Sequence, residues 1–324
     1  MKCESGTKIM IKQIPEDFIG ARLDKWLKHE VPALKQGMIE MMLRKGSIRV
    51  NGVKVKSSYR LVGSDEVLYP DDLGEIKVMD RPKRRKLPVP AQMIKDLRKC
   101  ILYEDDDILV INKPAGLSAQ GGTGQTQHLD SILEAMMGPG HGAPKLVHRL
   151  DKDTSGVMVV AKNLKTAQFL TREFSQKTIA KIYWAIVVGV PGKREGEVQL
   201  PLEKATFGDL EKIIVNEDGK YASTYYRVKD ALGKAFAWLE LEPHTGRTHQ
   251  LRVHCADTRG LNCPILGDGK YGGERAHPQG REQLHLHARA ITFTHPNGKT
   301  MTFQAELPHH MKATWEKLGL SIKG

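Results

Sequence analysis

The sequence has few cysteines and no long apolar run, and both absences exclude classes of protein. Its four cysteines, Cys3, Cys100, Cys255 and Cys263, include no Cys-x-x-Cys pair, which argues against a disulfide framework or a zinc knuckle and fits a reducing compartment. No apolar run approaches the roughly 20 residues of a membrane span. The opening residues, MKCESGTKIMIKQIPEDF, have no signal-peptide core and carry early acids, unlike a transit peptide. We therefore expect a cytoplasmic protein that does not cross a membrane.

Nucleotide-binding motifs are also missing. The glycine-rich stretch SAQGGTGQTQ at 118–127 has neither the G-x-G-x-x-G fingerprint of dinucleotide sites nor the G-x-x-x-x-G-K-[ST] loop that cradles phosphates. We interpret this stretch as a flexible loop and expect no nucleotide cofactor.

What the chain has in excess is positive charge. Its 324 residues carry a formal net charge of +12, and the pI is near 9.4. The hydrophobic content of 40% and the charged content of 27% are ordinary. An excess of this size favours a polyanionic partner, most often a nucleic acid. The alternative is a basic soluble protein without such a partner, and composition leaves both open.

Residues 20–70 are predicted to form a small domain. Apolar residues at helical spacing predict helices over 21–31 and 37–46. Asn51-Gly52, between alternating apolar and basic residues, predicts a β-hairpin. The methionines of the second helix are expected in the core: Met38, Met41 and Met42. Six cationic residues lie along this unit: Lys35, Arg44, Lys45, Arg49, Lys54 and Lys56.

The rest of the chain divides around this small domain. We expect an N-terminal arm over 1–19, a basic linker with prolines over 71–98, and a second, larger domain over 99–324. The linker can act as a solvated tether, as an additional phosphate contact, or as both.

The larger domain is predicted to contain strands that mostly follow one another without a helix after each. Strands are expected in DDILVINK, GVMVVAKN, KIYWAIVVGV, EVQLPLEK, STYYRVKD, AFAWLELEPH, RAITFTHP and MTFQAELP, and helices in LDSILEAMM and LKTAQFLTREFSQK. The fold class is therefore α+β, with a helix-helix-hairpin domain followed by a mostly antiparallel mixed sheet with flanking helices. This pattern disfavours a doubly wound fold.

The segment HRLDKDTSG, at 148–156, contains two carboxylates that could be chemical. A carboxylate is ionised at neutral pH without help, so Asp151 needs no partner base to act as a nucleophile. Thr154, Ser155 and Gly156 are small turn formers that could hold it at the start of the next strand. On spacing alone, Asp151 or Asp153 could instead be a turn cap, which is the usual role of Asp in such a stretch.

Two further places carry candidate residues. In HTGRTHQLRVHC, at 244–255, a helix is expected to begin about Arg247, and Arg252 within it could fork onto a carboxylate or a phosphate. His244, His249 and His254 recur every fifth residue, which does not stack them on one helical face, so structural roles or RNA contacts are favoured over zinc. In KIYWAIV, Tyr183 is either a core aromatic or a stacking platform for a base.

These segments resemble the RluA-type pseudouridine synthases, and the layout is most similar to the RluC-type members. The matching blocks occur in the family's order: INKPAG, HRLDKDTSG, KIYWA, TGRTHQLRVH, GDGKYG and LHLHA. The loop segment QGGTG at 120–124 fits the RluC type. The segment RKGSIRVNG resembles the small RNA-binding domain named after ribosomal small-subunit protein four. That domain's second helix opens here with LKQGM, where Lys35 keeps a cation at a turn that often carries Ser or Arg.

The resemblance implies that the protein isomerises uridine to pseudouridine within RNA, with no metal, oxidant or nucleotide. Asp151 is then the nucleophile, acting at C1′ of the ribose or at C6 of the base, and Asp153 orders the turn. Arg252 is implied to pair with Asp151. Tyr183 is implied to pack on the base and to help remove the C5 proton. Arg149 would fill the gap left by the flipped base, since a stacked base hides the reacting atoms.

The resemblance also suggests partners. We expect a monomer that binds RNA, most specifically large-subunit ribosomal RNA. The expected RNA contacts are Lys35, Arg44, Lys45, Arg49, Arg149, Arg247 and His249. Two other functions stay open: a noncatalytic RNA-binding ribosome-assembly factor, which would not need the three site residues together, and a metal-dependent RNA hydrolase, which would need clustered carboxylates.

Overall fold

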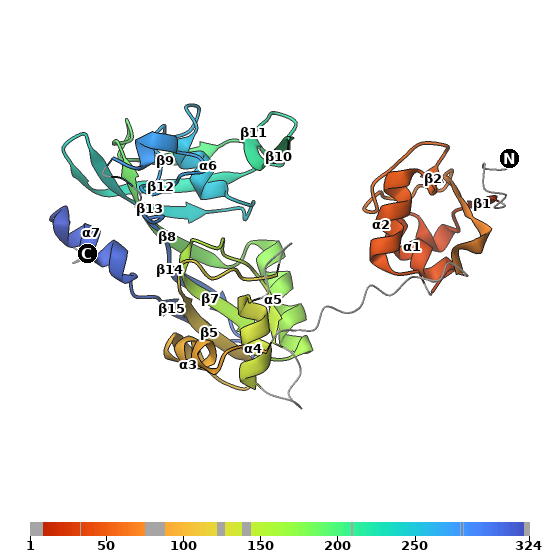
Figure 1. Ribbon diagram of the computed structural model, residues 1–324, viewed down its shortest axis with the longest axis horizontal. Coiled ribbons are helices and arrows are strands. Elements are labelled where there is room, and N and C mark those ends of the chain that lie inside the picture. The colour runs from red at the N-terminus through yellow and green to blue at the C-terminus, as the bar shows by residue number, and fades with distance from the viewer. Residues whose placement is uncertain are drawn as a thin grey trace. The chain divides into compact units, whose positions relative to one another are not determined.

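The structure of the protein is a computed structural model. It describes residues 9–32, 34–74, 88–121, 127–137, 144–208, 210–278, 280 and 282–320. The chain forms two compact units, Met1–Arg85 and Lys86–Gly324; Figure 1 labels helices and strands of each. Within the described ranges, no helix is long and apolar enough to cross a membrane.

The smaller unit is a three-stranded antiparallel sheet with two helices. The strands are β1 (Ile9–Gln13), β2 (Arg49–Val50) and β3 (Glu66–Pro70), in the order β1-β3-β2. The helices are α1 (Leu23–Glu30) and α2 (Gln36–Lys45), with short 3-10 turns at Glu16–Phe18 and Asp71–Gly74. Trp26 and Ile39 are fully buried between these elements. Gly46 ends α2 in the left-handed region, at φ 81°, where glycine carries no steric penalty.

Three features of this unit differ from the prediction. The turn at Asn51 and Gly52 has the positive φ angles of a hairpin turn, but only a single bridge, between Val50 and Val53, follows it. β2 pairs with β3 instead, and Val53, beyond the turn, is 62% exposed. β1 lies inside the predicted arm and pairs with β3. Met41 is exposed, whereas Met42 is buried as predicted.

The larger unit is built on one mixed sheet and a separate two-stranded hairpin. The sheet strands are β4 (Ile101–Glu104), β5 (Ile108–Lys113), β6 (Lys145–Leu146), β7 (Ser155–Ala161), β8 (Ala180–Val188), β9 (Glu195–Gln199), β12 (Ser223–Leu232), β13 (Phe236–Pro243), β14 (Leu286–Thr294) and β15 (Thr300–Gln304). The hairpin is β10 (Leu202–Phe207) and β11 (Leu210–Val215). The main sheet runs in the order β4-β5-β7-β14-β8-β13-β12-β9, with β6 on β7 and β15 on β14. Only the β7–β14 pairing is parallel in the described sheet, which confirms the mostly antiparallel prediction.

Helices cover this sheet on several sides (Figure 1). They are α3 (Ala91–Lys99), α4 (Leu129–Met137), α5 (Leu164–Gln176), α6 (Gln250–Ala256) and α7 (His309–Lys317), with a 3-10 turn at Gly273–Ala276. Helices α3, α4 and α5 bury Leu97, Leu133 and Leu170 against the apolar strands β5 and β7. The expected linker over 71–98 therefore includes most of α3, a helix that the sequence reading missed and that belongs to the core.

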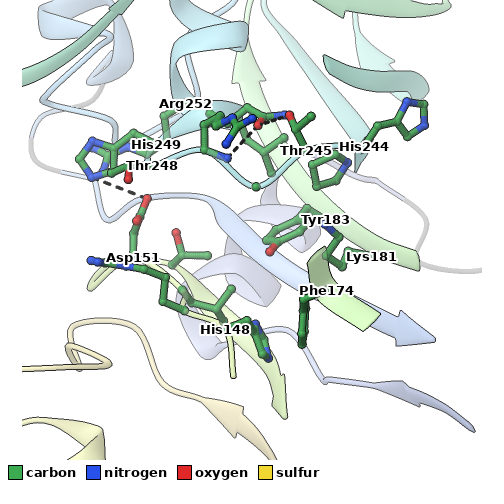
Figure 2. A pocket seen from close by; sticks show the side chains of 18 of the residues that line it. His148, Asp151, Phe174, Lys181, Tyr183, His244, Thr245, Thr248, His249 and Arg252 are labelled. Carbon is green, nitrogen blue, oxygen red and sulfur yellow. Dashed lines mark hydrogen bonds and ion pairs between the residues drawn. The ribbon is translucent and has the colours of Figure 1, made fainter. Parts of the chain in front are cut away.

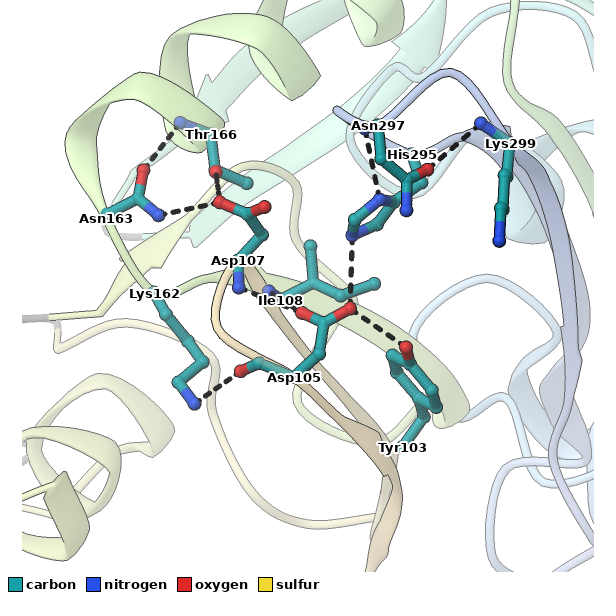
Figure 3. A network of polar contacts seen from close by, with 10 residues as sticks. All are labelled: Tyr103, Asp105, Asp107, Ile108, Lys162, Asn163, Thr166, His295, Asn297 and Lys299. Carbon is teal, nitrogen blue, oxygen red and sulfur yellow. Dashed lines mark hydrogen bonds and ion pairs between the residues drawn. The ribbon is translucent and has the colours of Figure 1, made fainter.

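A polar network anchors the start of α5 to the turn before β5 (Figure 3). Asn163 caps α5 by accepting the Thr166 backbone N–H at 2.8 Å. Asp107 accepts the Asn163 amide at 2.9 Å and the Thr166 hydroxyl at 2.8 Å, and these two donors hold the pKa of Asp107 below its ordinary value. The network fixes the helix that lies behind β7, the strand on which the predicted site loop ends.

The backbone conformation at position 156 explains why the HRLDKDTSG segment ends in glycine. Its φ is +118°, and a Cβ at this position would lie 2.2 Å from the Ala288 carbonyl oxygen. Glycine therefore permits the close parallel approach of β7 and β14 immediately after the loop that carries Asp151. The backbone at the end of the segment is held by the sheet itself.

Candidate active site

Asp151 lies on a loop between β6 and β7, at the boundary of two cavities. One cavity has a volume of about 450 Å³ and is also lined by Tyr183, His249 and Arg252. The other, about 920 Å³, shares Asp151, His249 and Arg252 with the first. The carboxylate is 18% exposed, so it is accessible from a cavity but only partly hydrated. Figure 2 shows it pointing from its loop toward the segment that carries His249 and Arg252.

A buried lysine holds this loop in place. Lys113, at the end of β5, is fully buried, and its Nζ donates to the carbonyls of Pro114, Leu117 and Lys152 at 3.0, 2.9 and 3.1 Å. Burial lowers the pKa of Lys113 to about 8, against the opposing charges of Asp153 and Asp151. Because the Lys152 carbonyl directly follows Asp151, this ammonium ties the loop to β5.

Tyr183, on β8, forms part of the wall of the smaller cavity. Tyr183 also packs against two of the apolar clusters of the larger unit. Burial first, and then the charge of Asp151, raise the pKa of the Tyr183 phenol well above its ordinary value. The residue is therefore core on one side and cavity lining on the other, and its hydroxyl is protonated in the free protein.

Arg252, on α6, pairs with a different carboxylate from the one that the resemblance implied. Its Nε and Nη2 donate to Asp268 Oδ2 and Oδ1 at 2.8 and 2.7 Å, and the Asp268 side chain has no exposed surface. Burial alone would lower the pKa of Arg252. The hydrogen bonds and the charge of Asp268, together with the smaller effect of the Asp151 charge, outweigh burial, so the pKa of Arg252 is raised above its ordinary value. The expected pairing with Asp151 is thus replaced by a fork onto Asp268, and Asp151 acts on this guanidinium only through its longer-range charge.

His249 occupies the position beside Asp151 instead. Its Nε2 lies 3.7 Å from Asp151 Oδ2, and its Nδ1 lies 2.6 Å from the Tyr271 hydroxyl. The sequence predicts an RNA contact for His249 and gives no signal for Lys113, Asp268 or Tyr271. The blocks INKPAG and GDGKYG contain these three residues, but spacing does not reveal which side chains meet.

The other histidines of the 244–255 segment have separate surroundings. His254 is buried, its Nδ1 lies 3.0 Å from Thr224 Oγ1, and burial lowers its pKa to about 4, so it is a structural histidine. His244 is exposed at the cavity rim. In the part of the chain that the structure describes, no group of three or more His, Cys, Asp or Glu side chains is arranged to hold a metal ion.

Cations gather around the smaller cavity. Its lining includes Arg149, Lys177, Lys181 and Arg247, and Arg149 and Arg247 are exposed. Arg247 Nε donates to the Tyr221 carbonyl at 3.0 Å, which directs the guanidinium along the rim. A carboxylate inside a ring of positive charge fits a polyanionic substrate that must bring a reacting group next to Asp151.

The small unit presents the remaining predicted cations on one stretch of chain. Arg44 and Lys45 form the last turn of α2, and Lys35 is its N-cap residue. Arg49 follows in β2, where its Nε donates to the Gly46 carbonyl at 2.9 Å. All four side chains are exposed, as an electrostatic contact to phosphates requires.

Part of the predicted QGGTG segment cannot be compared with the structure. Residues 122–124 lie outside the described residues, whereas Gln120 and Gly121 line the larger cavity. Asp153 is exposed on the same cavity, and its charge acts on buried Lys113.

Comparison with known proteins gives consistent matches along the chain. Residues 107–257 match the family model described as RNA pseudouridylate synthase, and residues 21–67 match the S4 domain. Proteins named ribosomal large subunit pseudouridine synthase C from Rickettsia felis and Escherichia coli are 39% and 37% identical to this chain. The match to the Rickettsia protein covers 90% of this chain and 95% of that protein. The match to the Escherichia protein covers 98% of this chain and 99% of that protein.

A solved structure agrees. Human RNA pseudouridylate synthase domain containing 4 is 29% identical, with a TM-score of 0.60, over 72% of this chain and 98% of the human chain.

Proposed function

Because the chain belongs to the RNA pseudouridylate synthase family and is an RNA pseudouridine synthase, we propose that it acts on specific uridines of large-subunit ribosomal RNA. The relatives named for the large ribosomal subunit support this substrate. The observation that carries the proposal is the juxtaposition of Asp151 and Tyr183 on one cavity with a cationic rim. We further propose that the protein acts as a cytoplasmic monomer.

Asp151 acts as the nucleophile in this proposal. A target uridine is flipped out of the RNA into the cavity, and Arg149 fills the gap that it leaves. The carboxylate attacks C1′ or adds to C6, the bond between N1 and C1′ breaks, and the uracil rotates. A bond then forms between C5 and C1′, C5 loses its proton, N1 gains one, and the carboxylate is released. Atoms and electrons balance without an oxidant, in keeping with an isomerisation.

Tyr183 packs on the target base and helps to remove the C5 proton. Its phenol is protonated in the free protein, in part because the charge of Asp151 raises its pKa. Covalent attack moves the negative charge of Asp151 onto the uracil that packs on Tyr183. The phenol then gives its hydroxyl proton to this anionic uracil, and its oxygen takes the C5 proton after the bond between C5 and C1′ has formed, so the proton transfer follows covalent attack.

Arg252 and the small unit contribute through charge. Held by Asp268, Arg252 presents a fixed cation near Asp151, which attracts the carboxylate and helps to hold its orientation. Lys35, Arg44, Lys45 and Arg49 bind RNA phosphates, and Arg247 does so at the cavity rim. These contacts set affinity, while the cavity selects the base that is flipped.

The test is a map of pseudouridine in cellular RNA with and without the gene. We expect signal to disappear at a few large-subunit ribosomal RNA positions and to return with the wild-type gene but not with Asp151→Asn. Loss confined to transfer RNA would contradict the ribosomal substrate, and an unchanged map would contradict the proposal as a whole.

A further inference from the structure

His249 and Tyr271 form a chain of polar contacts that ends at Asp151. The imidazole Nε2 lies 3.7 Å from Asp151 Oδ2, and Nδ1 lies 2.6 Å from the Tyr271 hydroxyl. The same hydroxyl accepts the backbone N–H of Ile213 at 3.2 Å. Because Ile213 belongs to β11, the contacts run from the β10–β11 hairpin to the nucleophile. Figure 2 shows the Asp151–His249 end of this chain.

The contacts decide which ring nitrogen carries the proton. Burial first raises the pKa of Tyr271, so its hydroxyl keeps its proton, and Ile213 N–H already occupies an acceptor site of the oxygen. The hydroxyl proton then points to His249 Nδ1, the ring atom at 2.6 Å. In a neutral imidazole an accepting Nδ1 leaves the proton on Nε2. That N–H faces the Asp151 carboxylate.

The backbone of His249 is held in a conformation that few histidines adopt. Its φ and ψ are 53° and 18°, in the left-handed region that only a few per cent of non-glycine residues adopt, Asn, Asp and His more often than the others. The surrounding segment enforces it, since Gln250 accepts the Arg247 N–H at 3.0 Å and is buried. Strain of this kind persists where neighbouring structure over-determines it and is concentrated at functional sites.

We propose that His249 is a positioning residue, which donates a hydrogen bond from Nε2 to the Asp151 carboxylate and is held in that tautomer by the Tyr271 hydroxyl. This rests on the proposed role of Asp151 as nucleophile. The separation of 3.7 Å in the free protein shortens when RNA fills the cavities, as catalytic contacts commonly do in a substrate complex. The donor fixes one carboxylate oxygen and turns the other toward the target nucleotide.

The groups around His249 set the direction of its pH dependence. It faces Asp151 on the loop before β7, Arg252 on α6, and Asp268, Lys270 and Tyr271 on the segment after α6. Burial, Arg252 and Lys270 outweigh the two carboxylates, so the pKa of His249 is lowered. Protonation of His249 would place a proton on Nδ1, so the Tyr271 hydroxyl would have to accept a hydrogen bond there. The resulting imidazolium would form an ion pair with the Asp151 carboxylate. Turnover therefore falls as pH drops through the pKa of His249.

Removing the Tyr271 hydroxyl should shift the acid limb of the pH–rate profile, the side on which turnover falls as pH drops, in a defined direction. Its hydrogen bond to Nδ1 stabilises the neutral imidazole, so Tyr271→Phe raises the pKa of His249. We expect the acid limb of the single-turnover rate to shift to higher pH, and the rate at its plateau to fall several-fold because the imidazole is no longer held in one tautomer. Tyr225→Phe is the matched control, since its hydroxyl bonds Glu195 at 2.9 Å on an exposed part of the sheet; its profile should equal that of the wild type.

Two substitutions of His249 separate positioning from packing. His249→Gln places an amide N–H near the position of Nε2, whereas His249→Asn is too short to reach Asp151 but tolerates the left-handed backbone. The measurement is tritium release from C5-labelled uridine in RNA, in a single turnover, with RNA affinity and melting temperature recorded for each full-length variant. We expect Asn to slow the rate by roughly 10²-fold, the scale for a misplaced reacting group, with RNA affinity within a few-fold, and Gln to recover at least several-fold of that loss.

Each outcome decides between the explanations. A wild-type rate in His249→Asn, a Gln variant no faster than Asn although both are folded, or an unmoved acid limb in Tyr271→Phe would contradict the inference. If His249→Asn does not fold, the Gln rate and the Tyr271→Phe profile decide it. Absence of tritium release by the wild type would instead overturn the proposed function, so the two failures are distinguishable.

Discussion

Neutralising Asp268 should destabilise the larger unit by about 3–5 kcal/mol, the usual penalty when one partner of a buried ion pair is removed. The Arg252 and Asp268 side chains are 9% and 0% exposed and make two short hydrogen bonds. In Asp268→Asn, the amide oxygen can still accept the backbone N–H groups of Lys270 and Tyr271, which bond Oδ1 at 3.1 Å. What is lost is the anion, so a buried guanidinium remains without its counter-charge.

The assay is calorimetric melting of the full chain, following the transition of the larger unit. For a unit of this size, each kcal/mol shifts the melting temperature by roughly 2–4 °C, so a fall of about 6–20 °C is expected. Glu195→Gln is the control: it also removes one carboxylate, but its partner Arg227 is half-exposed, and the expected change is within about 0.5 kcal/mol.

A double-mutant cycle isolates the pair. Arg252→Gln combined with Asp268→Asn leaves no unpaired charge, so the double variant should be clearly more stable than the sum of the single losses predicts. A loss below about 1 kcal/mol in Asp268→Asn, or strict additivity in the cycle, would refute the conclusion that this buried fork holds Arg252.

Three further outcomes are expected. Tyr183→Phe should keep its melting temperature and RNA affinity while single-turnover isomerisation slows by on the order of 10²-fold; an unchanged rate would leave Tyr183 as a packing residue. Removing residues 1–88 should leave a folded larger unit with weaker RNA binding and a shallower slope of log affinity against log salt; an unchanged slope would exclude the small unit from the RNA interface. Asp107→Asn should destabilise by about 1 kcal/mol at neutral pH, because hydrogen bonds to an ionised acceptor are stronger than those to an amide oxygen. Because the pKa of Asp107 is lowered by folding, the ionised carboxylate stabilises the fold fully above the unfolded pKa near 3.9, and this stabilisation is lost as pH falls through the folded pKa. The free energies of urea unfolding of the variant and the wild type should therefore converge in strong acid. A difference between them that does not change with pH would contradict this.

Local signals in the sequence predicted most of the fold. The apolar runs of β5 and β7 and the amphipathic pattern of α5 mark elements whose burial depends on their own residues. The hairpin at Asn51 shows the limit of such signals. A turn signal fixes the turn, but the choice of β3 as the partner of β2 depends on a strand that is distant in sequence.

The site shows the same limit. The motifs identified Asp151, Tyr183 and Arg252, and the structure brings all three to one cavity. They did not reveal that Asp268 holds Arg252, or that His249 faces Asp151, because each contact joins segments that only the tertiary fold brings together. The left-handed backbone of His249 has no sequence signature either, because histidine adopts this region more often than most residues but still in only a minority of its occurrences.

The most direct test of the central claim compares Asp151→Asn with Asp153→Asn in purified protein. Both remove one carboxylate from the same loop, but Asp151 lines both cavities, whereas Asp153 lines only the larger of the two. With C5-tritiated RNA, Asp151→Asn should release no tritium above background while binding RNA within a few-fold of the wild type, because binding rests mainly on phosphate contacts. Asp153→Asn should keep substantial activity. Retention of even about a tenth of the wild-type rate by Asp151→Asn, far more than loss of a covalent nucleophile allows, would contradict the assignment of Asp151 as the nucleophile.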